Sequence, residues 1–254
     1  MAALGRNRDG KTLGLQRREM MKEEKQQIAT ARETLGEAYA KISEPWEAAY
    51  VRFETPEQEI RKFARRLEKL GVVRLPREAR VVELFCGRGN GLHALERLGF
   101  TNLVGVDLSA RLIALYEGKA RCFVSDCRRL PFPDQSEDVL IVQGGLHHLT
   151  TLPADLAQTC AEMHRVLRRD GRAVIVEPWL TPFLRLVHSV SGMGLARKCS
   201  AKLDALATMI DYERVTYEQW LNQPGMILNI ARAHFSPVHE SFAWGKWMFV
   251  GKPL

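Results

Sequence analysis

The sequence predicts an α/β fold: a doubly wound, mostly parallel seven-stranded sheet with N-terminal helices and a helical insert before the last two strands. From residue 79, short apolar runs alternate with helix-forming stretches of about ten residues, which is typical of β-α-β units covered by helices on both faces. The alternation stops after Pro178, and two apolar runs close the chain. A length of 254 residues suits one large domain with appendages.

The chain before this alternation is predicted to be a tail followed by helices. Residues 1–14 are basic and contain glycine, and they are predicted to form a disordered tail. Residues 15–78 are predicted to form an N-terminal helical segment. Its clearest helix has Thr55 as its cap, Pro56 in its first turn and Gly71 at its end. One apolar face of this helix is formed by Ile60, Phe63, Ala64, Leu67 and Leu70.

Aromatic residues precede this helix. Trp46, Tyr50 and Phe53 either cover an active site as a lid or pack onto the core, and the sequence leaves both interpretations open. A longer helix is predicted further upstream, from Leu15 to about Ile42, because this stretch has helix-forming residues and no proline.

Residues 79–254 are predicted to form the main domain. Its predicted strands are 81–85, 103–106, 121–124, 138–142, 173–176, 238–243 and 246–250. Its predicted helices are 92–98, 110–117 and 156–167. Residues 179–236 are predicted to be a mainly helical insert, interrupted at Gly192–Gly194, and we expect this insert to cap an acceptor site. Trp244-Gly245 predicts a tight turn between the last two strands.

Composition excludes several classes of protein. With 46% hydrophobic and 26% charged residues, the chain is neither collagen-like nor wholly disordered. The five cysteines are odd in number and form no C-x-x-C pair, so we expect neither a disulfide framework nor a metal site. The N-terminus lacks a secretory h-region, and polar residues interrupt the apolar stretch 180–196. A soluble, cytoplasmic protein is therefore expected.

The net charge of +7 is unevenly distributed. Residues 61–80 carry eight basic and two acidic residues, whereas residues 81–178 are close to neutral. A basic helix can bind nucleic acid or anionic lipid, but a solvated helix face is the plainer interpretation. Nucleic-acid binding and peripheral membrane contact stay open on this ground.

The strongest motif is a glycine-rich turn. An apolar run at 81–85 leads into Cys86-Gly87-Arg88-Gly89-Asn90-Gly91, and a helix is predicted directly after it. Glycines let the backbone approach a ligand closely, and the N–H groups of such a turn can face an anion. A dinucleotide site would need a third glycine where this chain has Leu92, which weakens that interpretation.

Two acidic residues follow the next two predicted strands. Asp107 lies 20 residues after Gly87, where a carboxylate can accept hydrogen bonds from both hydroxyls of a ribose. Asp126 could contact the exocyclic amine of an adenine. Each could instead be a helix cap or a loop residue. Three features at three successive strand ends nevertheless favour a ligand site, because open α/β sheets bind ligands there.

These motifs resemble those of a known family. About 100 of the 254 residues, from Arg80 to Pro178, are similar to class I S-adenosylmethionine (SAM)-dependent methyltransferases, in particular the branch of ubiquinone and menaquinone biosynthesis methyltransferases. The matching stretches are Glu83-Leu-Phe-Cys-Gly-Arg-Gly, Gly105-Val-Asp-Leu-Ser, Asp126, Leu130-Pro-Phe-Pro-Asp-Gln-Ser-Glu-Asp-Val, Leu146-His-His-Leu and Met163-His-Arg-Val-Leu-Arg-Arg-Asp-Gly-Arg.

The resemblance implies SAM as the cofactor and a role for each matching position. Gly87 and Gly89 would form the turn under the methionine moiety, and Glu83 would steady that turn or reach the amino group of the ligand. Asp107 would contact the ribose, and Gln143 would lie near the methionine end. The adenine would be contacted by Leu108, Asp126 and Cys127. One departure is Phe85, where the family usually has glycine; its side chain could crowd the cofactor or alter the turn.

Candidates for acceptor chemistry lie after the fourth and fifth predicted strands. His147, His148 and Glu177 could act as acid or base, but a histidine at this place is usual in similar proteins whatever the substrate, which favours a structural role. Asp211, Tyr212 and Glu213 in the insert could bind an acceptor or form a solvated helix face. The sequence identifies no catalytic base.

The resulting expectation is a methyltransferase acting on a small or medium-sized metabolite, such as a lipid-like or glycan intermediate. Methylation of RNA, for example tRNA, is the alternative suggested by residues 61–80. A SAM-binding protein without catalytic activity is a third, suggested by Phe85. The acceptor, the methylated atom and the oligomeric state stay open.

Overall fold

A computed structural model describes residues 49–50, 52–191 and 199–254. The predicted tail, the predicted helix at 15–42, Trp46 and the interruption at 192–194 lie outside the described residues. A short 3-10 turn, η1 (Val72–Arg74), precedes the first strand, and the division of the chain at residue 79 stays a prediction.

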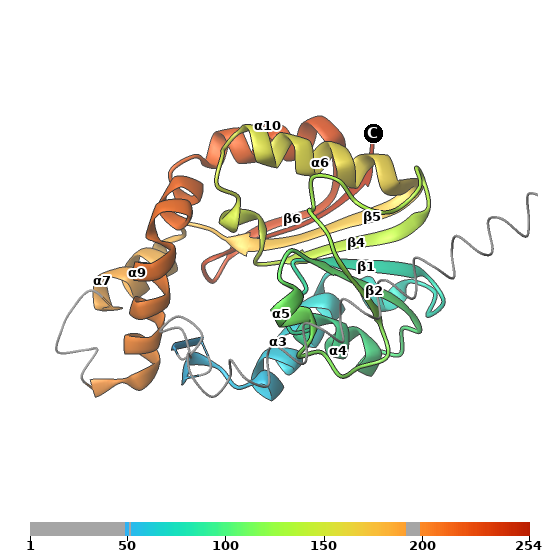
Figure 1. Ribbon diagram of the computed structural model, residues 1–254. Helices are drawn as coiled ribbons and strands as arrows, with labels where there is room; N and C mark the ends of the chain where they lie inside the picture. The colour runs from blue at the N-terminus through green and yellow to red at the C-terminus, as the bar shows by residue number, and fades with distance from the viewer. Residues whose placement is uncertain (1–48, 51, 192–198) are drawn as a thin grey trace, which may run out of the picture.

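The core of the molecule is one seven-stranded sheet in the order β3-β2-β1-β4-β5-β7-β6 (Figure 1). The strands are β1 (Arg80–Leu84), β2 (Asn102–Asp107), β3 (Arg121–Val124), β4 (Glu137–Gln143), β5 (Leu167–Pro178), β6 (Phe235–Ala243) and β7 (Lys246–Pro253). The first five strands are parallel to their neighbours, and β7 is antiparallel to both β5 and β6. The predicted mostly parallel sheet with a closing antiparallel hairpin is therefore confirmed.

Helices cover both faces of this sheet. On one face lie α3 (Pro56–Lys69), α4 (Asn90–Arg97) and α5 (Ala110–Ile113), and on the other lie α6 (Ala154–Val166) and α10 (Pro224–His234) (Figure 1). Apolar side chains of each layer form a separate core cluster with the strands. Because both faces are buried, the inner strands are apolar throughout; four residues of β4, 139–142, are at most 1% exposed.

The start of α3 follows its predicted capping. Thr55 accepts a hydrogen bond from the backbone N–H of Gln58, and the Gln58 side chain accepts one from the Thr55 N–H, so that the two form a capping box. Pro56 occupies the first turn, and Gly71 has a φ of 75° directly after the helix.

Two predicted elements differ from the observed ones in length. The helix predicted at 110–117 ends at Ile113, because the chain then turns to bring Tyr116 against Glu96 and the backbone N–H of Ala120. The strand predicted at 173–176 extends over Leu167–Pro178. Its first half includes exposed polar residues, which gave no apolar signal in the sequence.

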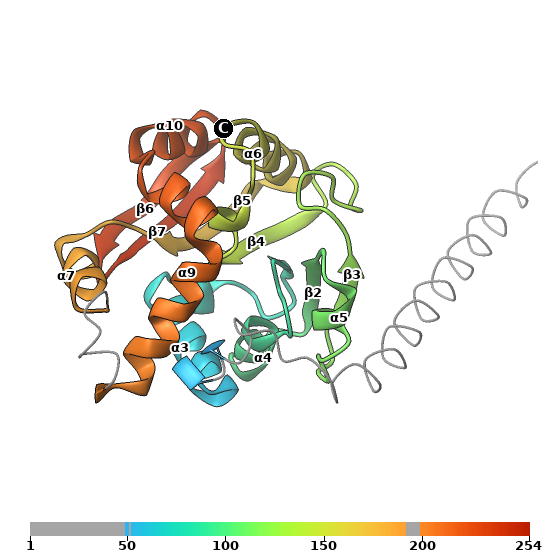
Figure 2. The ribbon, with the colours of Figure 1, turned by 60° about the vertical axis from the view of Figure 1, so that its left-hand side comes forward.

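The insert contains α7 (Pro182–Ser191) and α9 (Ala201–Leu221) before α10. Figure 2 shows α9 extending from the α10 end of the molecule toward α3. Ala205 and Met209 of α9 pack against Ala49, with Tyr50 and Phe53 beside them. Two of the three aromatic residues predicted as lid or core therefore contact the insert. Among the described residues, none of the helices has the length and apolar character to span a membrane.

The hairpin of β6 and β7 closes with the predicted tight turn. Trp244 and Gly245 have φ values of 53° and 75°, which is the pattern of a type I′ turn. The pairing register of β6 shifts between Pro237 and His239, so this edge strand carries a bulge.

Candidate functional site

The turn between β1 and α4 depends on glycine at specific positions. Gly89 has a φ of 81°, and a Cβ atom there would lie 2.1 Å from the ring of Tyr116. At Gly91, a Cβ atom would lie 1.6 Å from the Glu83 carboxylate. Only glycine therefore leaves room for Tyr116 and Glu83 beneath the first turn of α4. We refer to this turn and the ends of β2 and β3 beside it, residues 83–91, 107–109 and 124–128, as the glycine-turn side.

Phe85 adopts a left-handed conformation, with a φ of 56°. This conformation costs a residue with a Cβ atom about 1 kcal/mol, and it explains why glycine is favourable at this position. The ring of Phe85 packs against Gly145, where a Cβ atom would lie 2.2 Å from the Phe85 Cγ atom. The Phe85 side chain therefore fills the space between the ends of β1 and β4.

Glu83 is an acid held in the protein interior. It is 3% exposed, and its Oε2 atom has no hydrogen-bond partner. Burial, and then the negative charge of Glu59, raise the pKa of Glu83 well above its usual value. A buried carboxylate of this kind would be stabilised by a cationic group of a ligand.

Asp107 connects the turn to the end of β2. Its Oδ2 atom accepts a hydrogen bond of 2.8 Å from the Gly87 N–H, and its Oδ1 atom accepts one of 2.8 Å from the Ser109 N–H. Neighbouring Leu108, between β2 and α5, is 65% exposed. Asp107 thus fixes the turn, and Leu108 offers an apolar surface next to it.

Asp126 is bound by Arg128. The guanidinium and the backbone N–H of Arg128 both donate to the Asp126 carboxylate, and Arg128 also donates to Asp155 at 2.7 Å. Hydrogen bonding from Arg128 lowers the pKa of Asp126. Cys127 is buried, and its Sγ atom lies 3.5 Å from the Thr159 hydroxyl.

Buried polar atoms without partners concentrate at the ends of β1 and β4. Of the six such side-chain atoms in the described part of the chain, five belong to Glu83, Arg88 and Gln143. The Arg88 guanidinium stacks on the Tyr50 ring at 4.7 Å and lies 4.0 Å from the Glu59 carboxylate. A ligand that carries both an ammonium and a carboxylate group would satisfy these atoms.

Sequence reasoning did not assign a role to Arg88. Gly91 was also not singled out, and it is essential for the placement of Glu83.

A second group of residues lies at the ends of β4 and β5. Glu177, which is 0% exposed, accepts hydrogen bonds of 2.8 Å from the N–H groups of Gly145 and Leu146 at Oε1. Its Oε2 atom lies 2.7 Å from Nδ1 of His147 in the 3-10 turn η2 (Leu146–His148). Glu177 thereby positions His147, and its complete burial keeps it from contacting an acceptor. We refer to Gly145, His147, His148, Glu177 and Glu213 as the histidine side.

Electrostatics at the histidine side favour the charged forms of one pair, His147 and Glu177. Burial opposes the charged form of His147, but its hydrogen bond to Glu177 and the charge of Glu213 outweigh burial and raise its pKa. The same hydrogen bond outweighs burial at Glu177 and lowers its pKa. Desolvation, and then the charge of His147, lower the pKa of His148 to about 4, although 40% of its side chain is exposed.

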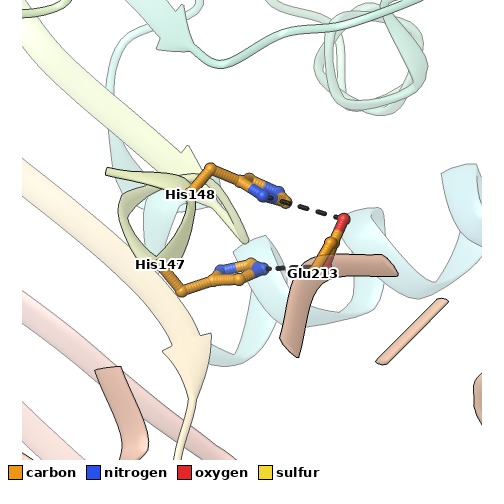
Figure 3. A group of neighbouring side chains, drawn as sticks. All are labelled: His147, His148 and Glu213. Atoms are coloured by element: carbon orange, nitrogen blue, oxygen red, sulfur yellow. Dashed lines mark ion pairs between the residues drawn. The ribbon is translucent and has the colours of Figure 1, made fainter. Parts of the chain in front are cut away.

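Glu213 of α9 completes this side (Figure 3). Its two carboxylate oxygens lie 3.8 Å from Nε2 of His147 and 3.7 Å from Nδ1 of His148. Of its predicted companions, Asp211 pairs with Arg214, and Tyr212 is 59% exposed. The structure thus brings Glu213 to the histidines, and the other two residues lie on the solvated face.

Comparison with known proteins identifies the domain type. Residues 82–175 match the family model described as "Methyltransferase domain". The chain is 34% identical over 132 residues to the ubiquinone/menaquinone biosynthesis C-methyltransferase UbiE of Geotalea uraniireducens, covering 46% of this chain and 54% of the relative. It is 37% identical over 159 residues to the demethylmenaquinone methyltransferase of Beutenbergia cavernae, covering 58% of this chain and 61% of the relative.

Solved structures share the fold at low sequence identity. A protein of Pyrococcus horikoshii aligns with a TM-score of 0.61 and 20% identity, over 83% of this chain and 99% of that one. A TehB-like SAM-dependent methyltransferase of Corynebacterium glutamicum aligns with a TM-score of 0.50 and 20% identity, over 76% and 87% of the two chains.

The two curated relatives are matched over little more than half of their length. The matched region of this chain nevertheless contains the glycine-turn side and the strands that carry it. The chain therefore contains a region, residues 82–175, that is similar to a methyltransferase domain, the domain type whose relatives use S-adenosylmethionine as cofactor.

Proposed function

We propose that the chain transfers the methyl group of SAM to a small or medium-sized, lipid-like metabolite. SAM supplies a methyl group already activated on a sulfonium, so that the protein mainly has to position the acceptor and exclude water. The first acceptor to test is demethylmenaquinone, because the matched relatives are named for ubiquinone and menaquinone biosynthesis.

The observation that carries this proposal is the set of unpartnered buried atoms on Glu83, Arg88 and Gln143. The methionine end of SAM has an ammonium and a carboxylate, and these match the Glu83 carboxylate and the Arg88 guanidinium in charge. Gly87 and Gly89 would form the turn beneath this end of the cofactor. We therefore assign Arg88 to the cofactor carboxylate, in addition to the residues predicted from the sequence.

The nucleoside would lie along the ends of β2 and β3. Asp107 keeps lone pairs for ribose hydroxyls beyond its two backbone hydrogen bonds. Exposed Leu108 would pack on the adenine ring, and Asp126 with the Cys127 backbone would meet the edge of the base. Arg128 would hold the Asp126 carboxylate in place for that contact.

A lipid-like acceptor is supported by the surface of the insert and the closing hairpin. Large apolar side chains are exposed there: Phe183, Leu186, Val215, Phe242 and Trp244. Phe183 and Trp244 contact each other, with ring centroids 5.4 Å apart. Isolated exposed apolar residues are common, whereas several on neighbouring elements indicate a surface that binds apolar partners. We assign residues 179–236 to this acceptor-binding role.

The two alternatives have less support. Three of the eight basic side chains of the 61–80 segment pair with acids: Arg61 with Glu57, Lys62 with Glu54 and Arg80 with Glu137. Paired cations attract nucleic acid less strongly than free ones. For the non-catalytic alternative, the Phe85 ring is directed at Gly145, so it occupies the space between two strand ends.

Calorimetric titration with S-adenosylhomocysteine tests the cofactor site. We expect micromolar binding to the wild-type protein and at least a tenfold loss in Leu108→Asp, because a carboxylate would face the adenine. Leu186→Asp is the matched control, since this leucine is similarly exposed at 62% but lies on α7. Asp107→Ala should also lose binding, although it additionally removes two hydrogen bonds of the turn.

No binding by the wild-type protein, or equal losses in both leucine variants, would contradict the proposed cofactor site. Where binding is found, incubation with labelled SAM and either a demethylmenaquinone or total tRNA identifies the acceptor class. Label in the lipid extract supports the proposal; label only in RNA supports the alternative.

A further inference from the structure

Three side chains of types that bind metals, two histidines and one glutamate, meet on the histidine side. One ring nitrogen of His147, one of His148 and one carboxylate oxygen of Glu213 all lie within 4.8 Å of one another (Figure 3). The two histidines come from η2 after β4, and Glu213 comes from the middle of α9 in the insert. No other group of this kind occurs among the residues that the structure describes.

The distances between Glu213 and the two histidines match ligands of one shared metal ion better than direct hydrogen bonds. The two distances from Glu213, 3.8 and 3.7 Å, are too long for hydrogen bonds. A bridging water would hold the two atoms about 4.5 Å apart, from two hydrogen bonds of about 2.8 Å. Two ligands at about 2.0–2.2 Å from one zinc ion are about 3.3–3.9 Å apart at angles of about 110–125°. The two observed distances, 3.8 Å from His147 Nε2 to Glu213 Oε2 and 3.7 Å from His148 Nδ1 to Glu213 Oε1, fall within that range.

The orientation of His147 is that of a supported metal ligand. Its Nδ1 atom lies 2.7 Å from the buried Glu177 carboxylate, and its Nε2 atom is thereby directed at Glu213. Metal-binding histidines commonly donate their second N–H to a carboxylate, which fixes the tautomer and the direction of the ring. Glu177 is itself held by the N–H groups of Gly145 and Leu146. The ring is therefore fixed before any ion arrives.

The surroundings provide both enclosure and access. His147 is 7% exposed, and the Tyr217 ring on α9 lies 6.0 Å from its ring. The Tyr217 hydroxyl lies 3.2 Å from Nε2 of His188 on α7, so that a second layer of side chains supports α9. The side chain of His148 is 40% exposed, which leaves a path for an ion from solvent.

We propose that His147, His148 and Glu213 bind a divalent transition-metal ion of the zinc type. Two imidazoles and one carboxylate form a ligand set that suits zinc, whereas magnesium and calcium prefer oxygen ligands. Three protein ligands leave a fourth position open, as in catalytic zinc sites. If the proposed function holds, this position takes an oxygen atom of the acceptor and orients it; that last step alone rests on the proposed function.

The test uses the full chain without an affinity tag, freed of metal by dialysis against a chelator. Zinc is titrated in competition with a chromophoric chelator, and cobalt(II) is added separately to follow its visible absorption. We expect one equivalent to bind at micromolar concentration or below, with cobalt bands of a four-coordinate site. Glu213→Gln and His148→Ala should each weaken zinc binding at least tenfold and remove the cobalt bands.

Glu218→Gln is the matched control, because Glu218 lies on the same helix, is 56% exposed and pairs with Arg214. It should bind zinc as the wild type does. Equal affinity in the wild type and Glu213→Gln, or wild-type binding weaker than about 100 μM, would overturn the proposal. Binding of S-adenosylhomocysteine by the same samples separates the two conclusions. A protein that binds zinc but not S-adenosylhomocysteine refutes only the proposed function. A protein that binds S-adenosylhomocysteine but not zinc refutes only the metal site.

Discussion

The glycine-turn side and the histidine side are held together by different means. On the first, a short stretch of chain is fixed by backbone hydrogen bonds, as between Asp107 and the N–H groups of Gly87 and Ser109. On the second, side chains from η2, β5 and α9 meet each other, and Glu213 lies 65 residues beyond His148. The first arrangement is specified locally, whereas the second exists only once the insert has packed.

The largest expected effect is at Gly91, on the glycine-turn side. Gly91→Ala would force a Cβ atom onto the Glu83 carboxylate, which is buried and cannot move into solvent. We expect a loss of about 3 kcal/mol in the free energy of unfolding, together with loss of S-adenosylhomocysteine binding. Chemical denaturation measures the first and calorimetry the second.

Gly225→Ala in α10 is the control for this variant, because a Cβ atom there meets nothing within 4 Å. It should leave stability unchanged or raise it by up to about 1 kcal/mol. If both alanine variants behaved alike, the close approach of Glu83 to α4 would not be what fixes the turn.

Phe85 and Gly145 join the two sides, and a double-mutant cycle measures that connection. Gly145→Ala places a Cβ atom 2.2 Å from Phe85 Cγ and should destabilise the fold by about 2 kcal/mol. In a Phe85→Gly background the same substitution should cost little, since the ring is gone. Thermal or denaturant unfolding of the four proteins gives the coupling free energy, and a value near zero would mean that the sides are built independently.

Lys246, at the start of β7 beside the end of β5, gives a pH test of the histidine side. Burial, and then the charge of Arg66, lower the pKa of Lys246 to about 8. An unfolded lysine titrates near pH 10.4, so the charged form is destabilised in the fold. The resulting loss in the free energy of unfolding is complete below pH 8 and disappears as the pH rises toward about 10.4.

Lys246→Met should therefore be more stable than the wild type at pH 7, by on the order of 2 kcal/mol, and the difference should shrink by pH 10. Urea denaturation of both proteins at the two pH values measures it. A difference that does not change with pH would mean that the ammonium is well solvated.

The smallest expected effect is at Arg128, which joins the end of β3 to α6 through Asp126 and Asp155. Its side chain is 38% exposed, so Arg128→Ala should cost little stability. Affinity for S-adenosylhomocysteine should fall a few-fold because Asp126 is no longer held. Arg214→Ala, which removes exposed ion pairs on α9, should leave that affinity unchanged.

Much of the glycine-turn side could be predicted because its signals are contiguous. The apolar run, the glycines and Asp107 lie within 27 residues, and each has a local physical requirement. Arg88 was missed because its unpartnered nitrogen atoms become apparent only when the turn is folded over Glu83. The unusual Phe85 was noted, but its left-handed conformation and its packing on Gly145 required coordinates.

The histidine side could be predicted only in part. His147, His148 and Glu177 were identified as neighbours because they follow adjacent strands. The carboxylate of Glu213 could not be assigned to them, since the path of α9 depends on tertiary packing against Ala49 and the aromatic residues beside it. The expectation of no metal site considered cysteine spacing alone, and it stays a prediction that the zinc titration decides.

The bulge in β6 has a consequence for how the sheet ends. A straight edge strand presents a row of free N–H and C=O groups to which another chain can add. Pro237 offers no N–H group, and the register shift between Pro237 and His239 breaks the regular spacing of the groups that remain. This edge is consequently a poor template for strand addition, which protects a hairpin that also exposes Trp244 and Phe242 from self-association through its backbone.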